Sequence, residues 1–145
     1  ILASGGLDNQ IKLWNLNTGH LVRTLTGHIN SVMSIAISPD GQILASSSKD
    51  KTIKVWNPNT GAVIRTLQGH TDIVNSIAIS PDGKTLISGS NDKTIKLWNL
   101  GTGDLIGTLS EHTNSVNVVA ISSDGQQFAS GSSDNTIKVW QLSTI

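Results

Sequence analysis

Apolar and polar residues alternate along this chain in short runs, and a period of two is typical of β-strands rather than helices. Between residues 28 and 69 the alternation predicts strands at 31–38, 43–47, 53–56 and 62–67. The segments between them hold turn-forming residues: Pro39-Asp40-Gly41, Lys49-Asp50-Lys51 and Asn59-Thr60-Gly61. Proline fixes φ and glycine accepts positive φ, so such segments reverse the chain. Four short strands joined by tight turns predict an antiparallel all-β meander.

The whole pattern recurs with a period of 42 residues. Three residue types keep this register: tryptophan at Trp14, Trp56, Trp98 and Trp140, aspartate at Asp8, Asp50, Asp92 and Asp134, and histidine at His28, His70 and His112. The Asp-Gly turn keeps it as well, at residues 40–41, 82–83 and 124–125. A fixed period shared by several independent residue types indicates a repeat architecture.

Two dipeptides inside each period carry a resemblance to a known family. Gly-His occurs as Gly27-His28 and Gly69-His70, and Trp-Asn stands for Trp-Asp at 14–15, 56–57 and 98–99. On these residues the chain resembles the WD40 family over its whole length. Mild departures are Glu111-His112, Ser122-Ser123-Asp124 in place of Ser-Pro-Asp, and Trp-Gln at 140–141. The resemblance implies an all-β WD40 β-propeller, in which four-stranded blades surround a channel.

The strand phase indicates how much of a propeller the chain would form. The resemblance implies about 3.5 four-stranded blades of a ring of about seven. We expect a partial blade at 1–27, full blades at 28–69 and 70–111, and a partial blade at 112–145. With strands named a to d from the channel outwards, the chain begins in strand b and ends after strand c. We therefore expect the C-terminal half of a longer propeller, with a homo-oligomer that closes the ring as the alternative.

An arc of blades would leave an apolar sheet face open at each end. The alternating apolar residues expected there are Leu2 and Ile11 at one end, and Phe128, Ile137 and Val139 at the other. Exposed sheet edges and apolar patches promote association. The sequence therefore predicts that the chain pairs with the rest of a longer propeller or with another copy.

Composition and charge remove several classes of function. The formal net charge is zero, which gives no electrostatic reason to expect nucleic acid or an anionic membrane as a partner. The absence of cysteine excludes disulfides and thiolate metal sites. No apolar run approaches the roughly 20 residues that span a bilayer, and the first residues do not resemble a signal peptide. No phosphate-binding or zinc-protease motif occurs, so we expect a cytoplasmic protein without cofactor.

Serine, histidine and aspartate recur in each period in a combination that suggests a catalytic triad. The set recurs in every period, which an active site rarely does, and the resemblance implies that these residues form a hydrogen-bonded chain from Trp through Ser and His to Asp. This structural reading is the preferred one, because a buried indole N–H, hydroxyl and imidazole must each find a partner. The residues are His28, Ser46, Asp50 and Trp56; His70, Ser88, Asp92 and Trp98; His112, Ser130, Asp134 and Trp140; and, without a histidine, Ser4, Asp8 and Trp14.

Two other recurring residues could suggest ligands. The histidines occur once per blade, too far apart around a ring to share a metal ion, so no metal site is expected. A lysine stands two residues before each tryptophan, at Lys12, Lys54, Lys96 and Lys138. A basic stripe for phosphate is one interpretation, but a stem that covers apolar surface with its ammonium at the rim is preferred.

Positions that differ between repeats are the candidate binding residues. In the family that the chain resembles, partners dock where the d–a and b–c loops emerge, at three and five residues after the His and one before the Asp. These positions are Leu7, Ser31, Met33, Lys49, Ile73, Asn75, Asn91, Ser115, Asn117 and Ser133. We therefore expect a protein-interaction scaffold, not an enzyme, that binds a partner protein or peptide. The alternative is a C-terminal regulatory or sensor module of a larger multidomain signalling protein.

Overall fold

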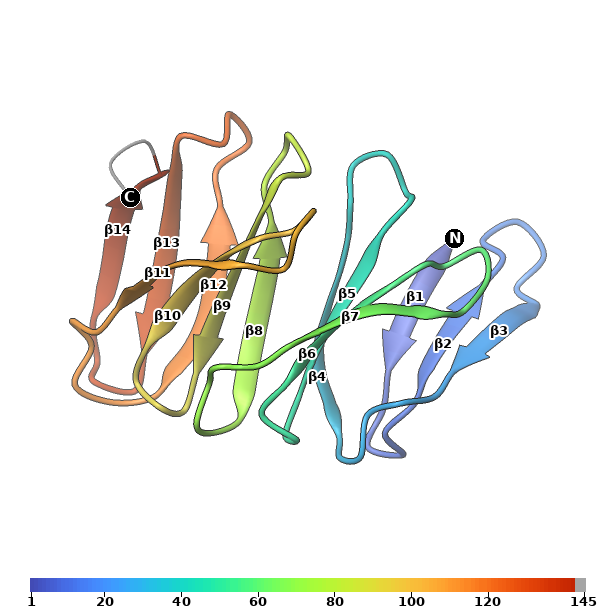
Figure 1. Cartoon of the computed structure of the whole chain (residues 1–145), viewed down its shortest axis with the longest axis horizontal. Coiled ribbons are helices and arrows are strands. Elements are labelled where there is room, and N and C mark those ends of the chain that lie inside the picture. The colour runs from blue at the N-terminus through green and yellow to red at the C-terminus, as the bar shows by residue number, and fades with distance from the viewer. Residues whose placement is uncertain (143–145) are drawn as a thin grey trace.

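The computed structural model describes residues 1–142 and consists of four antiparallel sheets set face to face in a row (Figure 1). Within these residues there are 14 strands, and each sheet is made of strands that follow one another in the sequence. The expectation of an all-β partial propeller is confirmed. The division of the chain at residues 27, 69 and 111 stays a prediction, as does the number of blades in a closed ring.

The strands have the following bounds. Sheet 1 holds β1 (Leu2–Gly5), β2 (Ile11–Trp14) and β3 (Leu21–Leu25). Sheet 2 holds β4 (Val32–Ile37), β5 (Leu44–Ser48), β6 (Ile53–Trp56) and β7 (Val63–Leu67). Sheet 3 holds β8 (Val74–Ile79), β9 (Thr85–Ser90), β10 (Ile95–Asn99) and β11 (Leu105–Leu109). Sheet 4 holds β12 (Val116–Ile121), β13 (Gln127–Ser132) and β14 (Ile137–Gln141).

Because neighbouring strands run antiparallel, the connections fall on two opposite edges of the row. The turns that carry Asp-Gly, at 38–43, 80–85 and 122–127, project at the upper edge of Figure 1. We call this the turn edge. The loops at 6–10, 49–52, 91–94 and 133–136 and the connections between sheets at 26–31, 68–73 and 110–115 lie on the other side, which we call the loop edge. All ten candidate binding residues therefore belong to the loop edge or to the strand ends beside it.

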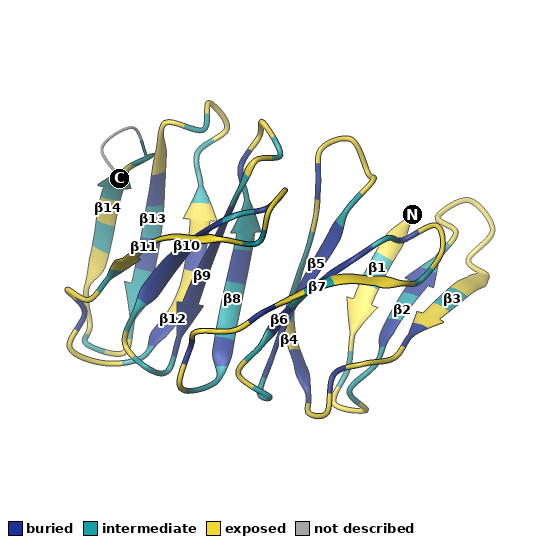
Figure 2. Cartoon of the chain, in the orientation of Figure 1, coloured by how far each residue is buried: buried dark blue, intermediate teal, exposed yellow. Residues whose placement is uncertain are grey.

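The hydrophobic core lies in the seams between sheets (Figure 2). In the seam between sheets 1 and 2, Leu13 and Leu25 pack against Val32, Leu44 and Trp56. The seams between sheets 2 and 3 and between sheets 3 and 4 repeat this arrangement around Trp98 and Phe128. Each inner sheet thus buries apolar residues on both faces, which is why the strands of sheets 2 and 3 hold the most buried residues.

The two end faces are less apolar than the sequence predicts. Ile11 and Phe128, expected on the open faces, are fully buried instead, so this part of the prediction was wrong. Side chains alternate along a strand, and Ile11 lies on the side of β2 that packs against sheet 2. Phe128 pairs with Trp140 across β13 and β14, on the side that packs against sheet 3. The other three residues are exposed, Ile137 to 78% and Val139 to 66%.

These exposed faces lead to a prediction about association. Ile137 and Val139 at one end and Leu2 at the other lie in open sheet faces, which favour contact with another β-sheet surface. We expect the purified 145-residue chain to form dimers or larger species in multi-angle light scattering. The double variant Ile137→Lys with Val139→Glu should shift the population toward the single-chain mass. A sharp melting transition from a wild-type monomer would contradict the prediction.

Polar contacts join the sheets across the seams. Ser34 Oγ accepts a hydrogen bond from Ile77 N at 3.3 Å, and Ser76 Oγ accepts one from Val119 N at 3.2 Å, exactly one period further along the chain. Arg23 donates to the carbonyl of Asn59 at 2.9 Å, and Arg65 donates likewise to the carbonyl of Gly101. The arginine bond therefore supplements apolar packing between sheets 1 and 2, the serine bond does so between sheets 3 and 4, and both occur between sheets 2 and 3.

Candidate functional site

The repeated Trp, Ser, His and Asp residues lie together in sheets 2, 3 and 4. In sheet 2, Trp56 Nε1–H donates to Ser46 Oγ at 2.8 Å, Ser46 Oγ lies 2.7 Å from His28 Nε2, and His28 Nδ1 lies 2.7 Å from Asp50 Oδ2. The three distances are 2.9, 2.7 and 2.7 Å in sheet 3, and 2.9, 2.8 and 2.7 Å in sheet 4. The chain of hydrogen bonds is thus almost the same in the three sheets.

The direction of each bond follows from which groups can donate. Hydrogen bonds lower the pKa of Asp50, although burial alone would raise it, so the carboxylate is ionised at neutral pH and only accepts. His28 Nδ1 therefore carries the proton, and its Nε2 accepts from the hydroxyl of Ser46. Ser46 in turn accepts the Trp56 N–H. Every member is satisfied, and such a network favours a single geometry.

Sheet 1 contains an incomplete version of this network. Trp14 Nε1–H donates to Ser4 Oγ at 2.9 Å, as in the other sheets. Asp8 is instead exposed and accepts from Gln10 N at 3.2 Å and from Lys12 Nζ at 3.4 Å. Within residues 1–142 no histidine ring contacts it. The carboxylate is therefore solvated, and its acceptor oxygens serve its own loop and Lys12.

A threonine extends the network in a way that the sequence reading missed. Thr52 Oγ1–H and Thr52 N–H both donate to Asp50 Oδ1, at 2.7 and 2.9 Å, and Thr94 and Thr136 do the same for Asp92 and Asp134. The signal was present in the sequence, because threonine follows these aspartates by two residues in each period. Asp50 Oδ2 also accepts from Ile29 N at 3.2 Å, so one carboxylate holds two segments of the loop edge together.

The network has the residue types of a catalytic triad without an accessible nucleophile. Ser46, Ser88 and Ser130 are buried, and each hydroxyl already accepts an indole N–H. A nucleophilic serine needs room for a substrate carbonyl and for oxyanion donors beside it. The three serines offer no such room. The arrangement is suited to fixing the loop edge rather than to acyl transfer.

Acid is expected to destabilise the fold in two steps. Burial lowers the pKa of His28 despite its hydrogen bond to Asp50, so the unfolded chain binds a proton more readily than the folded one. Stability should therefore fall as the pH drops below about 6.5, the usual histidine value. The lowered pKa of Asp50 and of Asp134 stabilises the fold above about pH 4, and that contribution is lost as the pH falls further.

Urea midpoints measured across this pH range test the prediction. The wild-type midpoint should decrease between neutral pH and about pH 5. The variant His28→Gln should start from a lower midpoint and show a shallower decrease over the same range. A wild-type midpoint that stays constant down to about pH 5 would show that the His28 ring is not protected from protonation.

The ten candidate binding residues fall into two groups on the loop edge. Several have partners within the fold: Asn75 Nδ2 donates to Asn91 Oδ1 at 2.6 Å and to Val116 O at 2.9 Å, and Asn117 Nδ2 donates to Ser133 Oγ at 2.8 Å. Ser31 is buried, and Lys49, Ile73 and Ser115 are half-buried. Leu7 and Met33 are exposed. The structure thus places all ten around one edge but leaves only some of them open to a partner.

The lysine stripe is engaged within its own sheets. Lys54 Nζ donates to Thr66 Oγ1 at 3.0 Å, and Lys96 Nζ donates to Thr108 Oγ1 at 2.9 Å. Lys96 is buried along most of its length. These contacts support the interpretation that the stems cover apolar surface, because the ammonium groups point to neighbouring strands rather than to one shared phosphate position.

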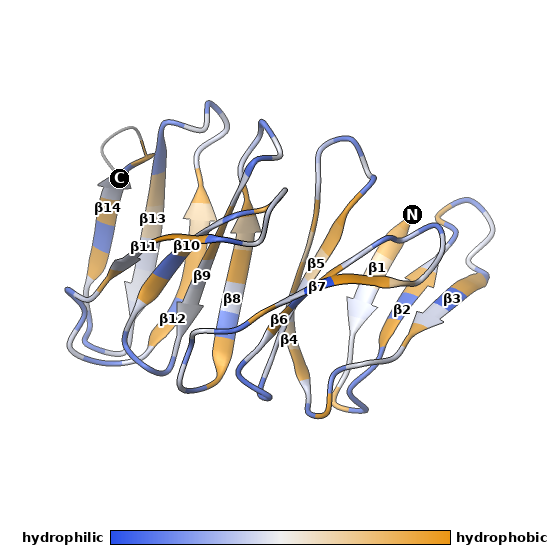
Figure 3. Ribbon diagram, viewed as in Figure 1, coloured by the Kyte–Doolittle hydropathy of each residue, from blue (hydrophilic) through white to orange (hydrophobic). Residues whose placement is uncertain are grey.

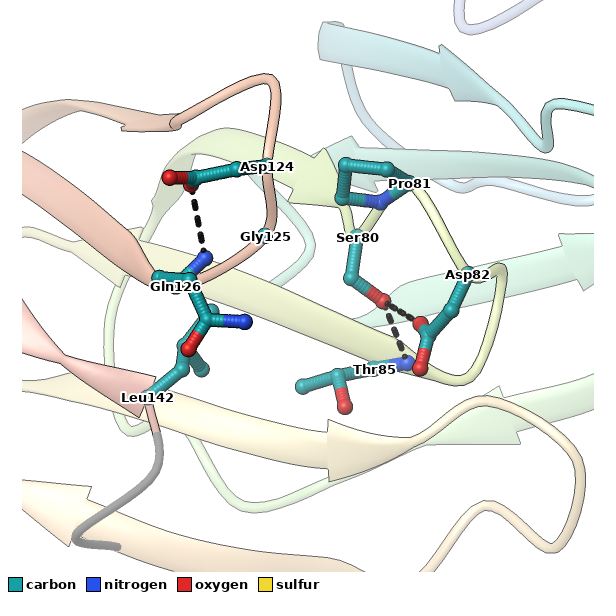
Figure 4. Close-up of a pocket in the computed structure, with 8 residues that line it drawn as sticks. All are labelled: Ser80, Pro81, Asp82, Thr85, Asp124, Gly125, Gln126 and Leu142. Atoms are coloured by element: carbon teal, nitrogen blue, oxygen red, sulfur yellow. Dashed lines mark hydrogen bonds between the residues drawn. The ribbon is translucent and has the colours of Figure 1, made fainter.

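A cavity of about 410 Å³ lies on the turn edge, between the turns of sheets 3 and 4 (Figure 4). Its two carboxylates already serve their own turns. Asp82 accepts from Ser80 Oγ at 2.5 Å, and Asp124 accepts from Gln126 N at 2.9 Å. These bonds, foremost the serine hydroxyls, lower the pKa of both aspartates. The cavity is separate from every candidate residue, and we assign no ligand to it.

Among residues 1–142 no group of three or more His, Asp or Glu side chains is placed to hold a metal ion. The same part of the chain contains no helix that is both long and apolar enough to cross a membrane.

Comparison with known proteins identifies one family. The family described as WD domain, G-beta repeat matches residues 19–57, 61–99 and 103–141. Each match starts just before the last strand of one sheet and runs through the third strand of the next. The first match, for example, covers β3 to β6. The repeat unit therefore crosses the seams.

Individual relatives match over one repeat. The chain is 46% identical over 44 residues to "Nuclear distribution protein PAC1" of Arthroderma otae, which covers 30% of this chain and 10% of that protein. It is 46% identical over 41 residues to the protein of the same name in Coprinopsis cinerea, covering 28% and 9%. It is 46% identical over 44 residues to "Lissencephaly-1 homolog" of Caenorhabditis briggsae, covering 30% and 11%. The match thus spans about a tenth of the length of these curated relatives.

Proposed function

Because this chain belongs to the WD40 family, the WD domain with G-beta repeats, we propose that it is a protein-interaction scaffold. It would bind a partner protein or peptide through its loop edge. One observation carries the proposal: the same network recurs in sheets 2, 3 and 4, while the residues around it differ. Met33, Asn75 and Asn117, for example, occupy the same position in successive repeats. A constant framework with variable loop residues is typical of binding surfaces.

The hydrogen bonds of the network support this function because they restrain the loops. Asp50 accepts from both Ile29 N and Thr52 N, which joins the connection before sheet 2 to the loop after β5. Lys49 N donates to Ser31 O at 3.0 Å across the same two segments. Loops held in one conformation lose little entropy when a partner binds, so more of the contact energy becomes affinity.

The proposal can be tested with random linear peptides displayed on phage and selected on the immobilised chain. Selected peptides should lose affinity for at least one loop-edge variant, such as Lys49→Ala near sheet 2 or Asn117→Ala near sheet 4. They should keep their affinity for the turn-edge variants Gln42→Ala and Lys84→Ala, which change exposed residues on the opposite side. A selection that yields no peptide above background, or only peptides sensitive to the turn-edge changes, would show that the loop edge is not the binding surface.

We also propose that the chain has no catalytic activity of its own. Ser46, Ser88 and Ser130 should not react with a fluorophosphonate probe, because their hydroxyls are buried and engaged. Mass spectrometry of the folded chain after exposure to the probe measures this. Stoichiometric labelling of any one of the three would restore the enzyme hypothesis. A cytoplasmic location stays a prediction in the same way.

A further inference from the structure

Three positions on the loop edge are apolar in only one part of the repeat array. Leu7, Ile29 and Met33 all lie at the seam between sheets 1 and 2, and we call them the rim patch. The equivalent positions hold polar residues elsewhere: Lys49, Asn91 and Ser133 for Leu7, Thr71 and Thr113 for Ile29, and Asn75 and Asn117 for Met33. The exposed fractions of Leu7, Ile29 and Met33 are 82, 84 and 39%. Apolar residues thus replace polar ones where solvent reaches them.

Hydrogen bonds hold the three segments of the rim patch next to one another. Val32 N donates to Gly6 O at 3.1 Å, so the residue before Leu7 is bonded to the residue before Met33. Ile29 N donates to Asp50 Oδ2, which places Ile29 beside the loop at 49–52. The loop at 6–10 and the connection at 26–31 project next to each other at the lower edge of Figure 1, and apolar residues colour both in Figure 3. The three residues therefore come from adjacent segments of the loop edge.

Packing within the fold does not account for the apolar character of these residues. None of the three belongs to the buried clusters in the seams. In sheets 3 and 4, Asn75 and Asn117 at the Met33 position donate hydrogen bonds to the neighbouring loop. Met33 has no amide group and cannot donate the equivalent hydrogen bond. An exposed apolar group of this kind on a polar rim is a mark of an interaction site.

The charges around the rim patch indicate what the partner carries. Lys49 and Lys51 border it on the loop that Ile29 contacts, and within residues 1–142 neither forms an ion pair with an aspartate or glutamate. The carboxylate between them, Asp50, faces His28 and Thr52 instead. Asp8, next to Leu7, is paired with Lys12 at 3.4 Å, so the charges beside the patch without an ion pair are positive, which complements an apolar group with carboxylates beside it.

We propose that the rim patch binds one bulky apolar side chain of a partner peptide, flanked by aspartate or glutamate. This inference rests on the proposed scaffold function and adds the chemistry of the partner. The apolar side chain would supply most of the affinity by covering Leu7, Ile29 and Met33, as the central residue of an interface usually does. The flanking carboxylates would pair with Lys49 and Lys51 and fix the direction of the peptide.

The repeats themselves supply matched variants for a test. The triple variant Leu7→Ser, Ile29→Thr and Met33→Asn introduces only residues that this chain already carries at equivalent positions. The control Ile73→Ser makes an equivalent change away from the patch, since Ser31 and Ser115 occupy that position in the other repeats. Circular dichroism and the urea midpoint of each variant show whether the fold is kept. The probes are the peptides selected on the wild-type chain from the random phage library.

The expected result has two parts. The selected peptides should share a large apolar residue next to Asp or Glu. The triple variant should bind them with an affinity at least about ten-fold lower than that of the wild type. The control Ile73→Ser should bind them with the wild-type affinity. The double variant Lys49→Glu with Lys51→Glu should bind peptides whose acidic flanks are changed to lysine better than it binds the originals.

Three outcomes would overturn the inference. Peptides that bind the loop edge but are insensitive to the triple variant would leave the scaffold function in place and refute the rim patch. Peptides that lack acidic flanks would refute the proposed chemistry of the partner. Stronger binding of the wild type than of the triple variant to phosphatidylserine vesicles, with no peptide selected, would show that the patch contacts membranes and would refute the scaffold function as well.

Discussion

Trp98→Ala is expected to lower the free energy of unfolding by about 3–5 kcal/mol, the usual range for removing a large aromatic residue from a core. Trp98 is buried in the seam between sheets 2 and 3, and it packs in the same cluster as Ile53, Val55 and Leu67. The change would leave a cavity across the seam, and it would also remove the donor to Ser88. The first effect weakens packing between two sheets, and the second removes a bond between β9 and β10 within sheet 3.

Urea unfolding followed by circular dichroism measures this change. Trp14→Ala is the matched control, because Trp14 donates to Ser4 in the same way but is only half-buried in sheet 1. The control should lose clearly less stability than Trp98→Ala. Equal losses would mean that burial in the seam is not what stabilises these sheets, and that the hydrogen bond to serine accounts for the effect.

Asp92→Ala is the second change with a large expected effect, a loss of about 1–3 kcal/mol. Asp92 accepts hydrogen bonds from His70 Nδ1, Thr71 N and Thr94, and the change leaves these donors without an acceptor. Asp104→Ala serves as the control, because Asp104 is exposed in a turn outside the network. The two urea midpoints should differ clearly. Identical midpoints would contradict the structural role of the network.

The conservative variant Asp92→Asn separates charge from hydrogen bonding. The amide keeps one oxygen acceptor but adds two donors where Thr94 and His70 already donate. We expect Asp92→Asn to lower the free energy of unfolding, but by less than Asp92→Ala does. The pH dependence of stability should weaken in Asp92→Asn, since the lowered pKa of the Asp92 carboxyl no longer contributes.

Most of the fold could be predicted from the sequence because local and repeated signals agree. The strand expected at 53–56 is found at Ile53–Trp56, and that expected at 43–47 is found at Leu44–Ser48. Alternation defines the strands, and the turn residues define where they end. The face of each outer strand was harder to predict, as Ile11 and Phe128 show, because alternation gives two faces without saying which one meets the neighbouring sheet.

The candidate site could be predicted in part. A repeated residue such as Thr52 is visible in the sequence, but its contact with Asp50 depends on the conformation of the loop. The internal partners of Asn75 and Asn117 were not visible either, because they lie on a different loop or on the next sheet. Variation between repeats therefore identified positions at the right edge, while the structure separates those that are engaged from those that face solvent.

One residue breaks a pattern of glycines at the seams. Gly5, Gly89 and Gly131 occupy one position in three repeats, and a Cβ on Gly89 would approach Val116 Cγ1 to 2.6 Å. In sheet 2 this position holds Ser47, whose hydroxyl is buried with no hydrogen-bond partner among the described residues. A buried, unpaired hydroxyl is destabilising. Nothing else in the structure explains why serine stands there.

Each 42-residue repeat spans parts of two neighbouring sheets, and this offset determines how such a chain could change in length. The 42-residue segment 61–102 carries the last strand of one sheet and the first three of the next, together with Arg65 and Ser76, which bond across seams. Duplication of that segment would insert a sheet between two existing ones, and both new junctions would reuse the arginine, serine and apolar contacts already present. Deletion would remove a sheet with equally little disturbance. The array could therefore grow or shrink by whole sheets without any seam having to be redesigned.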